Sequence, residues 1–224
     1  MGILSNKDTS SDNEMASNFH FPTSKRALII FTRNPELGKC KTRLAQTIGD
    51  EAALTVYKYL LQHTVKITKP VTANKFVFYS ENIHKNDIWE DTIFRKKRQE
   101  GSNLGLKMRN AFAELFNSGY EKIIIIGSDI LDLSTKHISD AFTKLDSHDV
   151  VIGPAQDGGY YLLGMKQLFP DIFENKTWGT ASVLKETIKN LQNQDLFLLE
   201  ELNDIDTFED LNNNNILKKL VTHD

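Results

Sequence analysis

The sequence has very little cysteine: Cys40 is the single cysteine among 224 residues. One thiol excludes a disulfide within the chain and is typical of a reducing compartment. No apolar run approaches the roughly 20 residues needed to span a bilayer. Residues 1–24 are rich in Ser, Asn, Asp and Thr and lack the apolar segment of a secretory signal. We therefore expect a disordered leader at 1–24, no membrane span and a cytoplasmic protein.

A surplus of positive charge is also lacking, because 27 Lys and Arg stand against 30 Asp and Glu and the formal net charge is -3. A chain without a basic surplus is poorly suited to neutralise a phosphate backbone, which argues against a nucleic-acid partner. The six histidines show no metal-ligand spacing, so we interpret them as structural or solvent-facing. No Gly-x-Ser-x-Gly elbow occurs, and Cys40 has no marked histidine partner. We therefore interpret Cys40 as a small loop residue and not as a nucleophile.

Short apolar segments alternate along the chain with stretches of helical spacing. The composition, 40% hydrophobic and 25% charged, suits a globular protein with a sizeable core. Strands are predicted at 27–32, 75–79, 92–98, 122–126, 149–154, 160–164 and 196–199. Helices are predicted at 42–48, from a cap at Asp50 to before Pro70, after caps at Asn103 and Ser134, at 181–190 and at 207–212. This alternation predicts an α/β sheet with right-handed crossovers.

A basic, glycine-containing loop at 35–44 separates the first strand from the first helix. Gly38 supplies a turn, and Lys41 and Arg43 flank Thr42 as the helix begins. Backbone N–H groups and cations at such a position can hold phosphate. The loop does not have the Walker A spacing. Taken alone, the pattern fits a solvated helix start as well as a nucleotide phosphate site.

Acidic residues follow two of the predicted segments. Asp129 comes directly after the strand at 122–126, at the sheet edge where α/β folds bind ligands. A carboxylate there can hold Mg²⁺ or Mn²⁺ beside substrate phosphates, or it can cap the next helix. Asp204 and Asp206 fall on one face of an extended segment. Either could complete a metal site with Asp129.

The stretch at 153–161 is dense in turn residues. Asp157-Gly158 alone predicts a hairpin turn, and the pair Gly158-Gly159 also allows close approach of a ligand to the backbone. Tyr160 and Tyr161 point to opposite faces of a strand, so we expect one of them to reach a pocket. Trp178 could close such a pocket, but its size favours a place in the core.

Five blocks in this order resemble a known family. They are Pro-x-x-Gly-x-x-Lys-Thr-Arg-Leu at 35–44, Gln-x-Gly-x-x-Leu-Gly-x-x-Met at 99–108, Gly-Ser-Asp at 127–129, Gly-Pro-Ala-x-Asp-Gly-Gly-Tyr-Tyr at 153–161 and Asp-Ile-Asp-Thr-x-x-Asp-Leu at 204–211. The chain is identified as a member of the bacterial glycosyltransferase-A-like family, first catalogued as a domain of unknown function. The family is also named radical-SAM/selenodomain-associated transferase 1, and it lies within the nucleotide-diphospho-sugar transferase superfamily.

The resemblance implies one GT-A-like domain over 25–224, with a single mixed, mostly parallel sheet flanked by helices. It implies a nucleotide across the carboxyl ends of the strands. The implied phosphate-binding residues are Gly38, Lys41, Thr42, Arg43 and Gly105. The implied metal ligands for Mg²⁺ or Mn²⁺ are Asp129 and Asp206, with Asp204 as a further candidate. The implied substrate-binding residues are Gly158, Gly159 and Tyr160.

The sequence departs from the family pattern in two places. Ile130-Leu131 stand where many relatives have a small residue and proline, so the local turn can differ. Lys107 stands where relatives often have Arg, which replaces a planar donor fork by a point charge.

Three functions are compatible with these residues. The family name favours glycosyl transfer from a nucleotide-activated sugar to an unknown acceptor. The basic loop suits nucleotidyl transfer, in which a phosphorylated acceptor attacks a nucleoside triphosphate and pyrophosphate leaves. A non-catalytic nucleotide-binding protein is the third. Asp157 is the candidate general base in either reaction.

Overall fold

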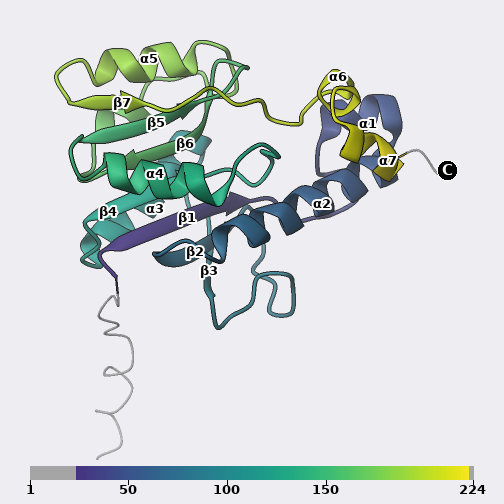
Figure 1. Cartoon of the computed structure of the whole chain (residues 1–224), viewed down its shortest axis with the longest axis horizontal. Coiled ribbons are helices and arrows are strands. Elements are labelled where there is room, and N and C mark those ends of the chain that lie inside the picture. The colour runs from purple at the N-terminus through teal and green to yellow at the C-terminus, as the bar shows by residue number, and fades with distance from the viewer. Residues whose placement is uncertain (1–23, 222–224) are drawn as a thin grey trace, which may run out of the picture.

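The structure is a computed structural model that describes residues 24–221 (Figure 1). Except for Ser24, the predicted leader lies outside the described residues. Seven strands form one sheet in the order β3-β2-β1-β4-β6-β5-β7. The strands are β1 (Arg26–Thr32), β2 (Asn74–Tyr79), β3 (Phe94–Arg98), β4 (Lys122–Ile126), β5 (Val150–Pro154), β6 (Tyr160–Met165) and β7 (Leu196–Leu198). Only β6 runs antiparallel to its neighbours in this sheet, which confirms the mixed, mostly parallel architecture.

Helices cover both faces of the sheet (Figure 1). They are α1 (Thr42–Ile48), α2 (Asp50–Thr68), α3 (Leu104–Asn117), α4 (Thr135–Lys144), α5 (Val183–Asn190), α6 (Phe208–Asn212) and α7 (Asn215–Val221), with a 3₁₀ turn at Pro170–Phe173. Helices α2 and α4 pack on one face and α3 on the other. Helices α1, α6 and α7 gather at one end of α2 (Figure 1). None of the helices between residues 24 and 221 has the length and apolar character needed to cross a membrane.

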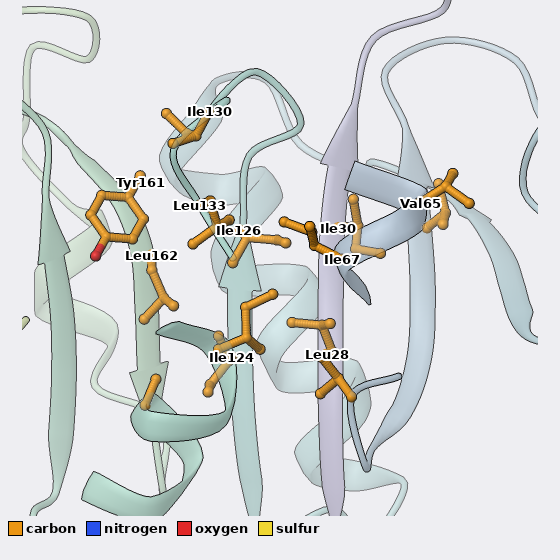
Figure 2. Close-up of a cluster of buried hydrophobic side chains, with 14 of the residues drawn as sticks. Leu28, Ile30, Val65, Ile67, Ile124, Ile126, Ile130, Leu133, Tyr161 and Leu162 are labelled. Atoms are coloured by element: carbon orange, nitrogen blue, oxygen red, sulfur yellow. The ribbon is translucent and has the colours of Figure 1, made fainter. Parts of the chain in front are cut away.

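The central strands are buried on both faces because their side chains alternate between two apolar clusters. Leu28 and Ile30 of β1 lie beside Ile124 and Ile126 of β4, on the same side as Val65 of α2 (Figure 2). The intervening residues pack against α3 on the opposite face, and they include Ala27, Ile29, Ile123 and Ile125. Each buried Leu or Ile side chain contributes roughly 1.5–3 kcal/mol to folding. The continuous apolar runs of the sequence are thus explained by two-sided burial.

One local prediction is wrong, and one helix was not predicted. Gly49, with φ 84°, is the N-cap of α2, and Asp50 is already the first helical residue. The left-handed conformation of Gly49 allows α2 to start directly after α1 ends, without a capping side chain. Helix α7 was not predicted, because its Asn-rich start conceals an apolar anchor, Leu217.

Loops from distant parts of the chain meet at the carboxyl ends of β1, β4 and β5. Two backbone hydrogen bonds bring the late acidic segment to this edge. The Leu202 N–H donates to the Pro154 carbonyl over 3.1 Å, and the Ile205 N–H donates to the Asp129 carbonyl over 3.3 Å. The side chain of Ile205 is buried against α1 and α2. The carboxylates on either side of Ile205 are therefore held next to Asp129.

Candidate active site

Lys41 is a buried cation between two carboxylates. Its side chain is 5% exposed, and Nζ lies 2.9 Å from Asp129 Oδ2 and 3.7 Å from Asp206 Oδ1. Arg43 Nη1 also lies 2.9 Å from Asp206 Oδ2, but its side chain is 67% exposed. The structure thus joins the basic loop to both acidic segments through one ammonium group.

The backbone at Lys41 adopts a strained conformation. Lys41 is the N-cap of α1 with φ 49° and ψ 47°, in the left-handed region that residues other than Gly rarely occupy. Such strain commonly marks functional positions. Burial lowers the pKa of Lys41, but the Asp129 carboxylate, followed by Asp206, outweighs this effect and raises the pKa above its usual value. Lys41 is therefore charged at neutral pH.

Asp204 adds a third carboxylate to the cluster. Burial, reinforced by the charge of Asp129, raises the pKa of Asp204 to about 6. One buried ammonium does not balance Asp129, Asp204 and Asp206, so the cluster has the hard oxygen donors and surplus negative charge that suit a divalent cation. Within residues 24–221, no three His, Cys, Asp or Glu side chains already form a metal-binding group, and the Lys41 ammonium lies between two of the candidate ligands.

Tyr57, on α2, connects the first loop to the Gly-Ser-Asp turn. Its hydroxyl accepts a hydrogen bond from the Arg33 N–H over 2.9 Å and lies 3.2 Å from Thr32 Oγ1 and 3.3 Å from Ser128 Oγ. The Tyr57 ring is buried on the inner face of α2. No signal in a single sequence marks its hydroxyl as the link between β1 and β4.

Cys40 and Asn34 brace the basic loop from inside. The Cys40 thiol donates to the Asn34 carbonyl over 3.1 Å, and the Asn34 side-chain amide donates to the Asn82 carbonyl over 2.7 Å. Burial raises the pKa of the Cys40 thiol. A buried, protonated thiol is a poor nucleophile, which agrees with the interpretation of Cys40 as a loop residue.

A polar chamber of about 600 Å³ lies beside Lys41. Its size is in the range that accommodates a nucleotide-sized ligand. The cationic side chains in its wall are Arg33, Lys39, Lys41 and Lys107. The Gln99 amide is fixed in the wall, where its Nε2 donates to the Phe78 and Thr32 carbonyls over 2.9 and 3.2 Å.

An apolar cavity of about 220 Å³ adjoins the polar chamber. The two share Phe31, Leu104, Gly127 and Asp129. The remaining cavity wall consists mainly of aromatic and aliphatic residues, among them Met108, Ile130, Tyr160, Trp178 and Val183. Trp178 therefore lines this cavity, and its partly buried side chain also packs against the α3-side core cluster, as expected from its size.

The predicted site residues divide between these two spaces. Lys41, Thr42, Asp129 and Asp206 line the polar chamber. The apolar cavity has in its wall Asp129, Asp157, Gly159, Tyr160 and Asp204. Both tyrosines of the Tyr-Tyr pair border this cavity, but Tyr160 packs with the α3-side cluster and Tyr161 with the α2-side cluster. The opposite orientation expected for a strand is thus observed.

Four predicted residues do not line either space. Gly38 has φ 72° and shapes the loop, and Arg43 is largely exposed. A Cβ at Gly105 would lie 2.4 Å from the Phe173 carbonyl oxygen, and one at Gly158 would lie 2.4 Å from the Ala181 oxygen. These two glycines permit close packing, and their roles in binding phosphate (Gly105) and substrate (Gly158) stay predictions.

The seven-stranded α/β sheet carries a polar chamber and an acidic cluster at its strand ends, where α/β folds bind nucleotides and other ligands. Residues 64–180 match the family described as "Uncharacterized protein conserved in bacteria (DUF2064)". The chain belongs to this family.

Characterised relatives are transferases. The chain is 31% identical over 197 residues to the 2-phospho-L-lactate guanylyltransferase of Methanocaldococcus vulcanius, covering 82% of each chain. It is 32% identical over 186 residues to that of Methanocaldococcus jannaschii, covering 78% of this chain and 76% of the relative. A structure from Desulfovibrio desulfuricans G20, provisionally described as a nucleotide-diphospho-sugar transferase, aligns with a TM-score of 0.79 and 30% identity over 84% of this chain and 85% of that one. These similarities confirm the predicted transferase class.

Proposed function

We propose that the protein is a nucleotidyltransferase that joins a nucleoside monophosphate to a small phosphorylated acceptor and releases pyrophosphate. The observation that carries this proposal is the meeting of a cationic chamber and a smaller cavity at Asp129. The guanylyltransferase relatives support it over the glycosyl transfer that the family name favoured.

In the proposed reaction, the nucleoside triphosphate occupies the polar chamber and the acceptor enters from the apolar cavity. An oxygen of the acceptor phosphate attacks the α-phosphorus, and the bond from this phosphorus to the oxygen shared with the β-phosphate breaks. The electron pair leaves with pyrophosphate. Lys41 is charged and lies in the chamber wall, so it can stabilise the charge of the departing phosphates when it exchanges its contact with Asp129 for them. Helix α1 has only 7 residues. We therefore expect the charge of Lys41 to contribute more to phosphate binding than the dipole of this short helix.

Asp129, Asp206 and Asp204 are the residues proposed to hold Mg²⁺ or Mn²⁺. When bound, such an ion supplies charge neutralisation at the reacting phosphates. The surplus of carboxylates over cations in the cluster supports this assignment.

Asp157 is not required as a general base in this reaction. A phosphate monoester has a second pKa near 6 and is already largely dianionic at neutral pH. No proton therefore has to be removed before attack. The Asp157 carboxylate accepts the Gly159 N–H over 2.8 Å, which supports a role in holding the turn at 155–159.

Glycosyl transfer remains the second candidate, because the relative from Desulfovibrio desulfuricans is described as a nucleotide-diphospho-sugar transferase. The experiment that separates the candidates supplies the purified chain and Mg²⁺ or Mn²⁺ with either four nucleoside triphosphates or a panel of nucleotide sugars. A mixture of phosphate monoesters serves as acceptor in both arms. We expect pyrophosphate release in the first arm, with GTP tested first. Nucleoside diphosphate release from a sugar donor alone would favour glycosyl transfer, and binding without either product would favour the non-catalytic alternative.

Asp129→Asn tests the site assignment within the same experiment. Loss of this charge is expected to reduce pyrophosphate release by about 100-fold or more, the scale seen when one transition-state contact is removed. Asp140→Asn is the matched control, because Asp140 pairs with Lys136 on the exposed surface of α4. Equal activity of the two variants would contradict the assignment.

Three further predictions from the sequence are part of the same proposal. They are membership of the radical-SAM-associated branch of the family, a cytoplasmic location and a single functional domain over 25–224.

A further inference from the structure

The walls of the two adjoining spaces differ in charge. The polar chamber has four cationic side chains in its wall, from Arg33, Lys39, Lys41 and Lys107, beside three carboxylates from Glu81, Asp129 and Asp206. Among the described residues that line the apolar cavity there is no Lys, Arg or His. Its charged groups are the carboxylates of Asp129, Asp157 and Asp204. An anion that enters this cavity therefore meets carboxylates and neutral groups, and no side-chain cation among the described lining residues.

The rest of the cavity wall is built for apolar contact. Phe31, Met108 and Val183 contribute side chains from three different elements. Trp178 is held against Gly105, where an added Cβ would lie 2.6 Å from the indole ring. This close approach fixes the indole as part of the cavity wall. A volume of about 220 Å³ limits the occupant to a small molecule.

The energetic consequence concerns the organic part of the acceptor. Its phosphate must lie at the junction with the polar chamber, where Lys41 is within reach of Asp129. A second anionic group, placed deeper in the cavity, would lose its hydration and find no cation. Burying an unpaired carboxylate costs several kcal/mol.

We propose that the acceptor is a phosphate monoester whose organic part is uncharged and largely apolar and carries no carboxylate. This inference rests on the proposed nucleotidyl transfer and adds the substrate class. It separates this chain from its guanylyltransferase relatives, because 2-phospho-L-lactate carries a carboxylate beside its phosphate.

Three acceptors of similar size test the inference: 2-phospho-L-lactate, its uncharged carboxamide and 2-butyl phosphate. Pyrophosphate release is measured with the purified chain, a nucleoside triphosphate and Mg²⁺ or Mn²⁺. We expect kcat/KM for each of the two acceptors without a carboxylate to exceed that for 2-phospho-L-lactate by at least about tenfold, equivalent to about 1.4 kcal/mol. Equal or better use of 2-phospho-L-lactate would overturn the inference and leave the proposed function intact. Absence of pyrophosphate release with every acceptor would overturn both.

Placing a cation in the cavity wall gives a second test. Thr180 lines the cavity and is exposed, whereas Thr177, also exposed, lies three positions earlier and does not line it. In Thr180→Lys, the ratio of kcat/KM for 2-phospho-L-lactate to that for the carboxamide should rise by about tenfold. In Thr177→Lys the ratio should stay at the wild-type value. Both kcat/KM values in this ratio are measured on the same variant, so a general loss of activity does not change the ratio. An unchanged ratio in Thr180→Lys would therefore contradict the proposal.

Discussion

Lys41 is a buried cation whose two partners come from distant loops. Its basic motif could be recognised in the sequence, and Asp129 and Asp206 could be selected there as candidate metal ligands. The pairing itself could not be predicted, because Asp129 lies 88 positions away in the chain. The burial of Lys41 and the exposure of Arg43 could not be predicted either, because two cations that flank one threonine look equivalent in a sequence. Only the left-handed backbone at Lys41 turns one of them inward.

Asp204 should make the stability of the metal-free protein depend on pH. Its pKa rises from 3.8 to about 6 on folding, chiefly through burial. The folded state therefore binds the proton more tightly, and the free energy of unfolding falls as pH rises from about 4 to about 6. In Asp204→Asn this penalty is removed. We expect urea titrations at pH 7.5 to show the variant about 1–2 kcal/mol more stable than the wild type, allowing for solvent screening.

The same comparison near pH 4 serves as the control. Both proteins then carry an uncharged side chain at position 204, so their stabilities should agree. A variant that is less stable than the wild type at pH 7.5 would show that the Asp204 carboxylate is stabilised by its surroundings, contrary to the destabilising effect of its burial.

Thr187 offers a prediction about stability that is independent of the site. Its side chain is fully buried in α5, and its hydroxyl finds no hydrogen-bond partner among the described residues. An unpartnered buried hydroxyl costs roughly 1 kcal/mol or more. Thr187→Val should therefore raise the free energy of unfolding by about 1 kcal/mol in urea titrations.

Thr68→Val is the matched control for this prediction. Thr68 is equally buried, but its hydroxyl donates to the Thr64 carbonyl over 2.7 Å. Its replacement should give no gain or a loss. Equal effects at the two positions would mean that the Thr187 hydroxyl has a partner in solution, such as water.

At the scale of elements, the strands and the long helices could be predicted because apolar periodicity reports burial directly. The predicted caps at Asn103 and Ser134 follow from local side-chain chemistry, and both are observed. The cavity could not be predicted in the same way. Its wall joins residues of β1, α3, β6 and α5 whose apolar character is the same as that of ordinary core residues.

The contact between the turn at 155–159 and the start of α5 should depend on Gly158. A Cβ there would lie 2.5 Å from Ala181 Cα, and the Gly158 carbonyl accepts the Leu184 N–H over 2.9 Å. Gly158→Ala should therefore displace α5 and with it one wall of the cavity. Gly119→Ala is the control, because Gly119 has φ 86° but nothing within 4 Å of an added Cβ. In both variants an alanine must adopt the positive φ of the glycine that it replaces. Thermal unfolding should therefore show that the free energy of unfolding of Gly158→Ala is about 1–3 kcal/mol lower than that of Gly119→Ala. Equal losses would contradict the packing role of Gly158.

For the whole molecule, the order of the strands places the reacting groups. Strand β4 lies between β1 and β6, so Asp129 stands between the basic loop of β1 and the turn that leads into β6. The chamber and the cavity meet at this point. The fold class followed from the alternation of strands and helices and from the resemblance. The choice between glycosyl and nucleotidyl transfer could not be made from the sequence, because both reactions use the same cations and carboxylates at the same sheet edge.

The central claim is that a phosphate oxygen of the acceptor becomes bonded to the α-phosphorus of a nucleoside triphosphate. The most direct measurement is ³¹P NMR of the products formed by the purified chain from GTP, 2-butyl phosphate and Mg²⁺. We expect new diphosphate-diester resonances to appear in step with an equal amount of pyrophosphate, and to be absent with Asp129→Asn. Formation of inorganic phosphate or free nucleoside diphosphate without a diphosphate diester would contradict the claim.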